Sequence, residues 1–279
     1  MARDGAPEPS WLASELGQRV VSGLVMIAAA LAAAYWGGWP FALFWLLAAL
    51  AILVEWLAVT GASPRGRLRL VLGAGLLGLG LGYLLALPLL AGAAVVAAVL
   101  AAFALARTGV DRGWAVAGFV CAAVIALVPP AVRDHPGLGL SAILWMFAVV
   151  WTTDVAAYFT GRSLGGPRLW PAVSPKKTWS GFLGGLGGGT AAGLAVAVVA
   201  QRHGAAPFGL AAVAVLSAAA SVVGQLGDLA ESALKRHFGV KDSGNLIPGH
   251  GGVMDRLDAF WAVALFVGLL LAGAQAARG

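Results

Sequence analysis

Charged side chains are scarce in this chain of 279 residues: Asp, Glu, Lys and Arg make up 11% of it, against 60% hydrophobic residues. Soluble domains carry roughly 25% charged residues, so this composition excludes an ordinary soluble protein. Cysteine occurs once, as Cys121 in an apolar run, which excludes a disulfide framework within the chain. Most of the chain also lacks Lys/Arg runs interleaved with aromatic residues, so we expect no binding of nucleic acid.

Long apolar runs fill most of the sequence, and about 20 such residues are enough to cross a membrane as a helix. Nine spans can be placed, at 20–36, 41–59, 70–87, 89–106, 114–128, 140–159, 181–200, 208–234 and 257–272, with Pro129 and Pro130 ending the fifth. The glycine run at 181–189 suits close packing of helices in lipid. We therefore expect an all-α integral membrane protein with about nine transmembrane helices.

The distribution of basic residues predicts the orientation of these spans, because cytoplasmic loops are enriched in Lys and Arg. With the N-terminus in the cytoplasm, fifteen of the eighteen Lys and Arg residues fall in cytoplasmic segments, and only Arg133, Arg202 and Arg278 fall outside. The C-terminus is then outside. We expect a multi-pass protein of the cell inner (cytoplasmic) membrane, with a cytoplasmic segment at 1–19, N-terminal scaffold helices at 20–136 and a C-terminal transmembrane catalytic region at 137–279.

The few charges gather in two places. The C-terminal charged segment, residues 227–260, holds nine of the thirty charged residues, and the central charged segment, residues 154–177, holds five more. All four lysines of the chain lie in these two segments. Charge is costly in a membrane, so intramembrane carboxylates are functional candidates by default. Both segments fall on the cytoplasmic side in the predicted topology, and we expect the active site there.

Helical spacing sorts the charges of the C-terminal segment. Asp228 and Lys235 lie at i and i+7 and therefore share one face of the eighth span. An ordinary helix end with a Glu231–Lys235 pair explains part of this pattern, but it leaves unexplained an aspartate that follows twenty uncharged residues. Asp255 and Asp258 share a face at the start of the ninth span. The helix dipole alone accounts for one of these two acids.

Carboxylates from two helices beside several lysines are typical of a divalent-metal and phosphate site. Oxygen ligands suit Mg²⁺, which commonly takes one or two carboxylates while substrate phosphates complete its shell. Zinc is disfavoured, because no cysteine lies nearby and His237 and His250 lack the spacing of partner ligands. Glycines at 244–252 favour a tight loop whose backbone N–H groups can assist with phosphate. His250 in that loop is either structural or functional, and the sequence leaves both interpretations open.

The central charged segment combines Asp154 at the end of the sixth span with Lys176 and Lys177 in the stretch SPKKTW. Basic residues at a membrane surface can simply anchor the chain to anionic headgroups. Four basic residues beside an intramembrane acid favour recognition of a multiply charged ligand instead.

These segments resemble the phosphatidate cytidylyltransferase (CDP-diglyceride synthase) family. The pattern S-x-L-K-R, four residues, K-D-x-G and then P-x-H-G-G-x-x-D-R-x-D runs in full from Ser232 to Asp258. The stretches DxxAYFxGRxxG and SPKKTW resemble a second region of the family. Together these motifs cover roughly a quarter of the chain. One departure is Ser180, where many relatives carry an acid after SPKKTW.

The resemblance implies transfer of CMP from CTP to phosphatidate, which yields CDP-diacylglycerol and pyrophosphate for phospholipid biosynthesis. It implies Mg²⁺ as cofactor, with a second, monovalent or divalent, cation left open. Asp228, Asp255 and Asp258 would be the metal residues, and catalytic roles would fall to Lys176, Lys235, Lys241, Asp228 and Asp255. The candidate substrate-binding residues are Asp154, Arg162, Ser174, Lys176, Lys177, Ser232, Lys235, Arg236, Lys241, His250, Gly251, Gly252 and Arg256. The expected partners are CTP, phosphatidate and membrane lipid, and symmetry statistics alone favour a homodimer.

Two other functions are also compatible with these residues. A CTP-dependent lipid kinase would use similar residues but would move the γ-phosphoryl group and release CDP. A cation-coupled secondary transporter would use intramembrane acids as ion sites, and Glu55 within the second span is the residue it would need. Transport predicts two symmetry-related halves, and no such internal repeat is visible in the sequence.

Overall fold

The structure is a computed structural model of the chain, and it describes residues 15–205 and 208–277. Within these ranges it contains nine helices: α1 (Glu15–Trp36), α2 (Gly38–Val59), α3 (Arg65–Leu84), α4 (Pro88–Leu105), α5 (Gly109–Asp134), α6 (Gly139–Leu164), α7 (Trp179–Arg202), α8 (Leu210–His237) and α9 (Met254–Ala276). Each described helix is long and apolar enough to cross a membrane. The predicted all-α membrane class is confirmed. Most of the predicted cytoplasmic segment 1–19 lies outside the described residues, and the orientation of the termini stays a prediction.

The fifth span is longer than predicted, because α5 continues through Pro129 and Pro130 to Asp134. Each proline removes one backbone donor from the helix. In a membrane bundle, neighbouring helices compensate for such a break, and both prolines are buried against them. The expected end of this span at residue 128 was therefore wrong. Pro88, in contrast, begins α4, where a missing N–H costs nothing.

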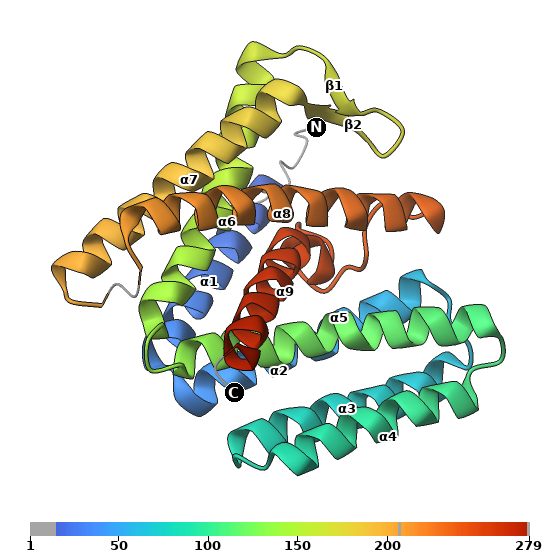
Figure 1. The fold of residues 1–279 in the computed structure, drawn as a ribbon. Helices are drawn as coiled ribbons and strands as arrows, with labels where there is room; N and C mark the ends of the chain where they lie inside the picture. The colour runs from blue at the N-terminus through green and yellow to red at the C-terminus, as the bar shows by residue number, and fades with distance from the viewer. Residues whose placement is uncertain (1–14, 206–207, 278–279) are drawn as a thin grey trace, which may run out of the picture.

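Helices adjacent in sequence pack against one another: α6 with α7 and α3 with α4 run antiparallel, while α9 crosses α8 at a steep angle (Figure 1). The α6–α7 contact depends on glycines at every fourth position of α7. A Cβ atom added at Gly189 would lie 2.2 Å from Thr153 Oγ1, and one at Gly185 would lie 3.0 Å from the carbonyl oxygen of the same threonine. The glycine run therefore serves helix packing, as the sequence indicated.

A continuous apolar core joins the first five helices to α6, α8 and α9. At its centre the Trp45 ring of α2 stacks on Phe260 of α9 with the ring centroids 4.7 Å apart, and Phe147 of α6 lies 5.5 Å from Phe260. The predicted boundary between scaffold and catalytic region, at 136/137, falls in the turn between α5 and α6. This packing fixes the start of α9 against helices from both sides of that boundary.

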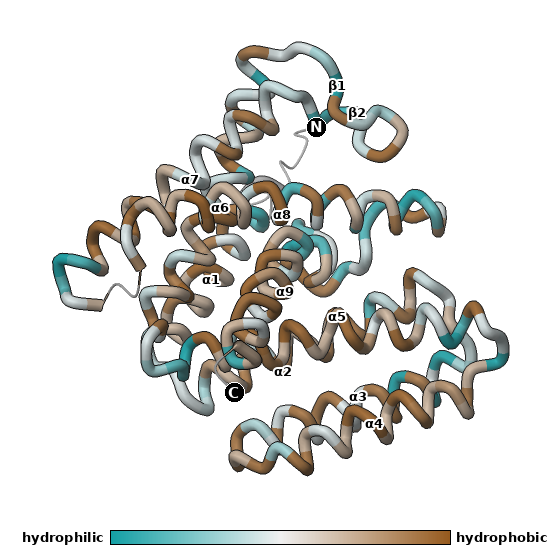
Figure 2. The backbone as a smooth tube through the Cα atoms, viewed as in Figure 1, coloured by the Kyte–Doolittle hydropathy of each residue, from teal (hydrophilic) through white to brown (hydrophobic). Residues whose placement is uncertain are grey.

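A short hairpin interrupts the helical pattern between α6 and α7. Strands β1 (Arg168–Trp170) and β2 (Ser174–Thr178) pair antiparallel, with Arg168 opposite Thr178 and Trp170 opposite Ser174. No strand was expected here from the sequence. Because successive side chains of a strand point to opposite faces, the hairpin separates Lys176 from Lys177. Figure 2 shows that hydrophilic residues occur mainly in such connections and at helix ends, while the helices are largely hydrophobic.

Candidate active site

An ion pair joins the two charged segments. The Nζ atom of Lys177 in β2 lies 2.5 Å from Oδ2 of Asp228 in α8, and the two side chains are 28% and 31% exposed. These residues are far apart in sequence and come together because α7 returns the chain from the hairpin to α8 (Figure 1). The prediction that both segments contribute to a single site therefore agrees with the geometry.

More carboxylates surround this pair. Asp154 of α6 and Asp258 of α9 both lie within electrostatic range of Asp228, and Glu231 lies beside Asp258. We call these four acids, together with Lys177, Lys235 and Asp255, the charged cluster. Within the described part of the chain, no N–H or hydroxyl donor reaches the buried Oε1 of Glu231, and the carboxyl groups of Glu231 and Asp258 share a hydrogen bond. Two buried carboxyl groups this close need a shared proton or a cation, so this side of the charged cluster suits a cation.

Asp255 has different surroundings, because its oxygens are already occupied. Lys235 Nζ lies 2.7 Å from Oδ1, and the backbone N–H groups of Ser243 and Gly252 each donate to Oδ2 at 2.9 Å. The side chain is only 5% exposed. Asp255 thus anchors the loop between α8 and α9, and Lys235 bridges it to Glu231 at 3.1 Å.

The metal prediction fits this arrangement in part. Across residues 15–205 and 208–277, no three His, Cys, Asp or Glu side chains converge as a ready metal site. Asp228 and Asp258 fit a Mg²⁺ ion whose shell substrate phosphates would complete. Asp255 does not fit in this arrangement, since a metal would have to displace its lysine and backbone donors. The three-aspartate metal set stays a prediction.

The loop from 241 to 253 borders an open polar cavity of about 520 Å³, which we call the loop cavity. Its basic lining residues come from three elements, namely Arg19 of α1, Lys241 of the loop and Arg256 of α9. The lining also includes the acid Asp242, but the three basic residues leave it with a net positive charge, which suits a polyanion. Arg19 was counted in the sequence only as a topology signal, and no local pattern connects it with a loop more than two hundred residues later.

His250 lines the same cavity and is held from α1. Its Nδ1 lies 2.7 Å from Ser22 Oγ, and its carbonyl oxygen accepts a hydrogen bond from Arg256 Nε at 3.1 Å. Partial burial and the nearby Arg256 charge lower the pKa of the imidazole below its ordinary value. The geometry gives His250 a structural contact and a place beside the cavity, which keeps both sequence interpretations open.

The adjacent glycines have steric roles. Gly251 has a φ of +84°, a conformation that other residues rarely adopt. A Cβ atom at Gly252 would lie 2.1 Å from Ser243 Oγ, so only glycine allows this close approach. Both residues therefore shape the loop, whether or not they also contact a ligand.

Several other candidates lie outside the charged cluster. Arg162 donates to the Tyr158 hydroxyl at 2.7 Å, and Arg236 donates to the carbonyl oxygen of Val240 at 3.5 Å. Lys176 is exposed on the strand face opposite Lys177, and Ser174 begins that strand. Ser232 is closer to the site, since its hydroxyl lies 3.4 Å from Asp228 Oδ1.

Ser180, the departure from the family pattern, has a structural contact of its own. Its hydroxyl donates to the carbonyl oxygen of Gly165 and lies 3.0 Å from Thr178 Oγ1. It therefore ties the first turn of α7 to the end of α6, beside the hairpin that carries Lys177.

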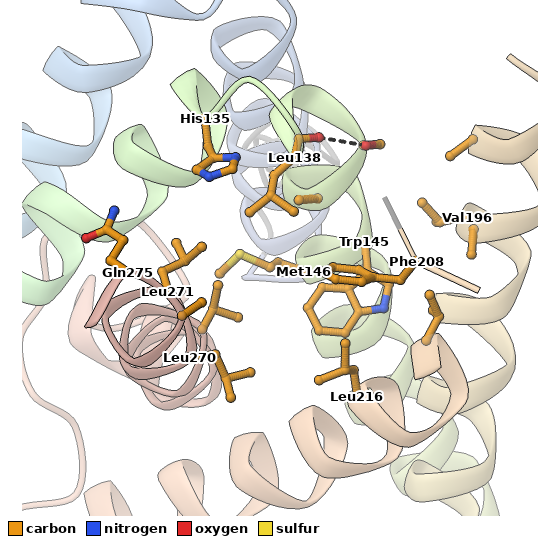
Figure 3. A pocket seen from close by; sticks show the side chains of 17 residues that line it. His135, Leu138, Trp145, Met146, Val196, Phe208, Leu216, Leu270, Leu271 and Gln275 are labelled. Carbon is orange, nitrogen blue, oxygen red and sulfur yellow. Dashed lines mark hydrogen bonds between the residues drawn. The ribbon is translucent and has the colours of Figure 1, made fainter. Parts of the chain in front are cut away.

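A second cavity, of about 260 Å³, lies at the opposite ends of α6 to α9, and we call it the apolar cavity. Figure 3 shows Trp145, Met146, Leu270 and Leu271 around it, with His135 and Gln275 at one side. Aliphatic and aromatic side chains dominate its lining, so it offers little that could neutralise phosphate. The chemistry of this region therefore belongs to the charged end of the helices.

Comparison with known proteins shows the family of this chain. The model of the cytidylyltransferase family matches residues 17–273. The chain belongs to this family. It is similar to the phosphatidate cytidylyltransferase of Brucella suis biovar 1 (strain 1330), with 41% identity over 251 residues, or 90% of this chain and 91% of the relative. The corresponding Bacillus subtilis (strain 168) protein is 46% identical over 141 residues, or 50% of this chain and 51% of the relative. The predicted family is confirmed, and with it the assignment as an enzyme.

Proposed function

We propose that this membrane protein transfers CMP from CTP to phosphatidate and releases CDP-diacylglycerol and pyrophosphate. Relatives that match nine-tenths of the chain are named for this activity. The single observation that carries the proposal is the Lys177–Asp228 ion pair, which brings both charged segments of the motif into one site. A lipid kinase or a transporter would leave this family relationship unexplained.

The reaction is an in-line displacement at phosphorus. A phosphate oxygen of phosphatidate attacks the α-phosphorus of CTP, and the bond from that phosphorus to the bridging oxygen breaks with its electron pair leaving on pyrophosphate. The attacking oxygen is already anionic at neutral pH and needs little help from a base. Catalysis then depends on positioning the two phosphates and on neutralising their charge.

We assign the two substrates to the two basic regions. The loop cavity opens where the hydrophilic loops lie, and its Arg19, Lys241 and Arg256 suit the triphosphate of soluble CTP. Lys177 lies on the hairpin beside the helix ends, where it suits the phosphate of a lipid embedded in the membrane. Arg162, Ser174, Lys176, Ser232 and Arg236 remain candidates through the family resemblance.

The acids of the charged cluster suit the proposed Mg²⁺. Asp228 and Asp258 would hold the ion, while Asp255 keeps the loop and Lys235 in place. When bound, Mg²⁺ neutralises charge on the reacting phosphate and the departing pyrophosphate. A second, monovalent or divalent, cation near the carboxyl groups of Glu231 and Asp258 is part of the same proposal.

We further propose that the protein lies in the cell inner membrane with this site on the cytoplasmic side and the C-terminus outside. Fifteen of its eighteen basic residues fall on that side in the nine-span arrangement. The contact of Ser22, near the start of α1, with the loop between α8 and α9 supports placing both on one side. Membrane lipid and a second copy of the chain are the remaining proposed partners.

The purified protein can be tested with phosphatidate, Mg²⁺ and CTP labelled at the γ-phosphate. We expect the label in pyrophosphate and little product from Asp228→Asn. The matched control is Asp134→Asn, which removes an acid bonded to the Tyr83 hydroxyl at 2.6 Å, away from the charged cluster. Label in the lipid would replace the proposal with a kinase, and cation flux in liposomes without product would replace it with a transporter.

A further inference from the structure

Glu55 is a buried carboxylate in α2, a helix assigned from the sequence to the scaffold. Its side chain is 3% exposed. Among the described residues, Oε1 accepts from the backbone N–H of Val253 at 2.9 Å, and Oε2 accepts from the N–H of Met254 at 2.8 Å and from Ser243 Oγ at 3.1 Å. The carboxylate therefore contacts both ends of the loop that surrounds the loop cavity.

The start of α9 explains why such a contact is needed. The first N–H groups of any helix lack partners within the helix, and a polar N-cap side chain usually accepts from them. The N-cap residue of α9 is Val253, which has no side-chain acceptor. Glu55 supplies the missing acceptors from another helix, and its negative charge also favours the N-terminal end of the α9 dipole.

The capped turn carries residues of the charged cluster. Asp255 and Asp258 follow Val253 by two and five residues, and Ser243 is held from two sides, by Glu55 at its hydroxyl and by Asp255 at its N–H. Releasing the carboxylate would therefore free the loop and the first turn of α9 together.

The packing around Glu55 limits it to this role. A Cβ atom at Gly252 would lie 2.6 Å from Oε2, and one at Gly244 would lie 2.9 Å from Oε1. The loop backbone thus packs directly against the carboxylate and separates it from the loop cavity. The site that a transporter would require at Glu55 is filled by the protein's own N–H groups.

We propose that Glu55 is a positioning residue that caps α9 across the fold and holds the 241–253 loop in the shape that binds CTP. This inference rests on the proposed binding of CTP in the loop cavity. A small misplacement of reacting groups can cost about 100-fold in rate, so a change at a residue remote from the substrates is expected to reach catalysis.

The test is steady-state kinetics of purified full-length Glu55→Gln and Glu55→Ala, with the folded fraction measured by size-exclusion chromatography. Glutamine keeps the length but retains only one accepting oxygen. We expect KM for CTP to rise and kcat to fall by up to about 100-fold in the alanine variant. The glutamine variant should be intermediate, and KM for phosphatidate should not change. A merely structural role would lower the folded fraction and leave both KM values unchanged.

Asp111→Asn is the matched control, because Asp111 also accepts backbone N–H groups at a helix start, at 3.0 Å from Ser63 and 3.2 Å from Thr108. Asp111 caps α5 and does not touch the 241–253 loop, so the KM of the Asp111→Asn variant for CTP should equal that of the wild type. If the Glu55 variants do not fold, Ser243→Ala removes one of the three contacts and should raise KM for CTP by a smaller factor.

The result that overturns the inference is an unchanged KM for CTP and unchanged kcat per folded molecule in the Glu55 variants, or in Ser243→Ala where those do not fold. Lys241→Ala and Arg256→Ala separate this failure from failure of the proposed nucleotide site. If they raise KM for CTP while the Glu55 variants do not, the site stands and the positioning role is lost. If they too leave KM unchanged, the assignment of CTP to the loop cavity is lost.

Discussion

The two ends of helices α6 to α9 differ in what they enclose. One end holds the charged cluster, in which acids from α6, α8 and α9 face lysines from β2 and α8. The other end encloses the apolar cavity, lined by Met146, Leu270 and similar side chains (Figure 3). The same four helices therefore provide a polar and an apolar environment within the length of a membrane span.

The difference shows how charge is maintained in a mostly apolar protein. At the charged end, the hairpin and the 241–253 loop supply lysines and backbone N–H groups to the acids, as with Lys177 to Asp228 and Gly252 to Asp255. The apolar end has few such donors, so a carboxylate there would remain unpaired at high cost.

Breaking the Lys177–Asp228 pair should have the largest effect. We expect Lys177→Met and Asp228→Asn each to lower kcat/KM by roughly 100-fold or more. The first removes a positive charge that would neutralise a reacting phosphate, and the second removes a proposed Mg²⁺ ligand. The double variant should lose little beyond either single one, because the two residues act as a unit. Lys176→Met, on the opposite face of the strand, should cost less. Equal losses for the two lysine variants would contradict the geometry.

Asp255→Asn should affect both stability and rate. The change leaves Lys235 or a buried N–H without its acceptor, which costs about 1–3 kcal/mol in unfolding free energy. Thermal unfolding in detergent and the activity of the folded fraction measure the two effects separately. A stable variant with full activity would refute the anchoring role of Asp255.

At the apolar end, a new charge should damage folding without damaging chemistry. Leu271→Asp places an unpaired carboxylate beside the apolar cavity and should cost about 2.5–3.5 kcal/mol of stability. The protein that still folds should keep the kcat of the wild type, as should Leu271→Met, the size-matched control. A selective loss of kcat in the aspartate variant would mean that the two ends are coupled.

The smallest effect concerns pH. The pKa of His250 is lowered in the folded protein by burial and by Arg256, so the unfolded chain binds a proton more readily. The contribution of His250 to the free energy of unfolding is therefore fully present above the ordinary histidine pKa. It is lost as the pH falls from that value towards the lowered pKa of the folded protein. His250→Asn should show a slightly smaller fall in melting temperature between neutral and mildly acidic pH. If the melting temperature of this variant falls as steeply as that of the wild type, His250 does not contribute to the pH dependence of stability.

Much of the site was predictable because it depends on local pattern. Helical spacing placed Asp228 and Lys235 on one face, and Lys235 does lie between Glu231 and Asp255. The separation of Lys176 from Lys177 was not predicted, because no strand was expected at SPKKT from the sequence. Arg19 and Glu55 escaped notice as parts of the site for a different reason: each meets the loop through contacts between segments remote in sequence.

The number and character of the membrane helices, and the two segments in which charge gathers, follow from the sequence alone. The free energy of placing about 20 apolar residues, or a charge, in lipid depends on that one segment. Which acids have hydrogen-bond donors, and which do not, follows from the packing of the helices. Among the described residues, Asp255 is filled by donors from its own loop, Oε1 of Glu231 lacks an N–H or hydroxyl donor, and Glu55 caps α9. Hydrogen bonding depends on the position of a partner, and that position exists only once the helices have packed.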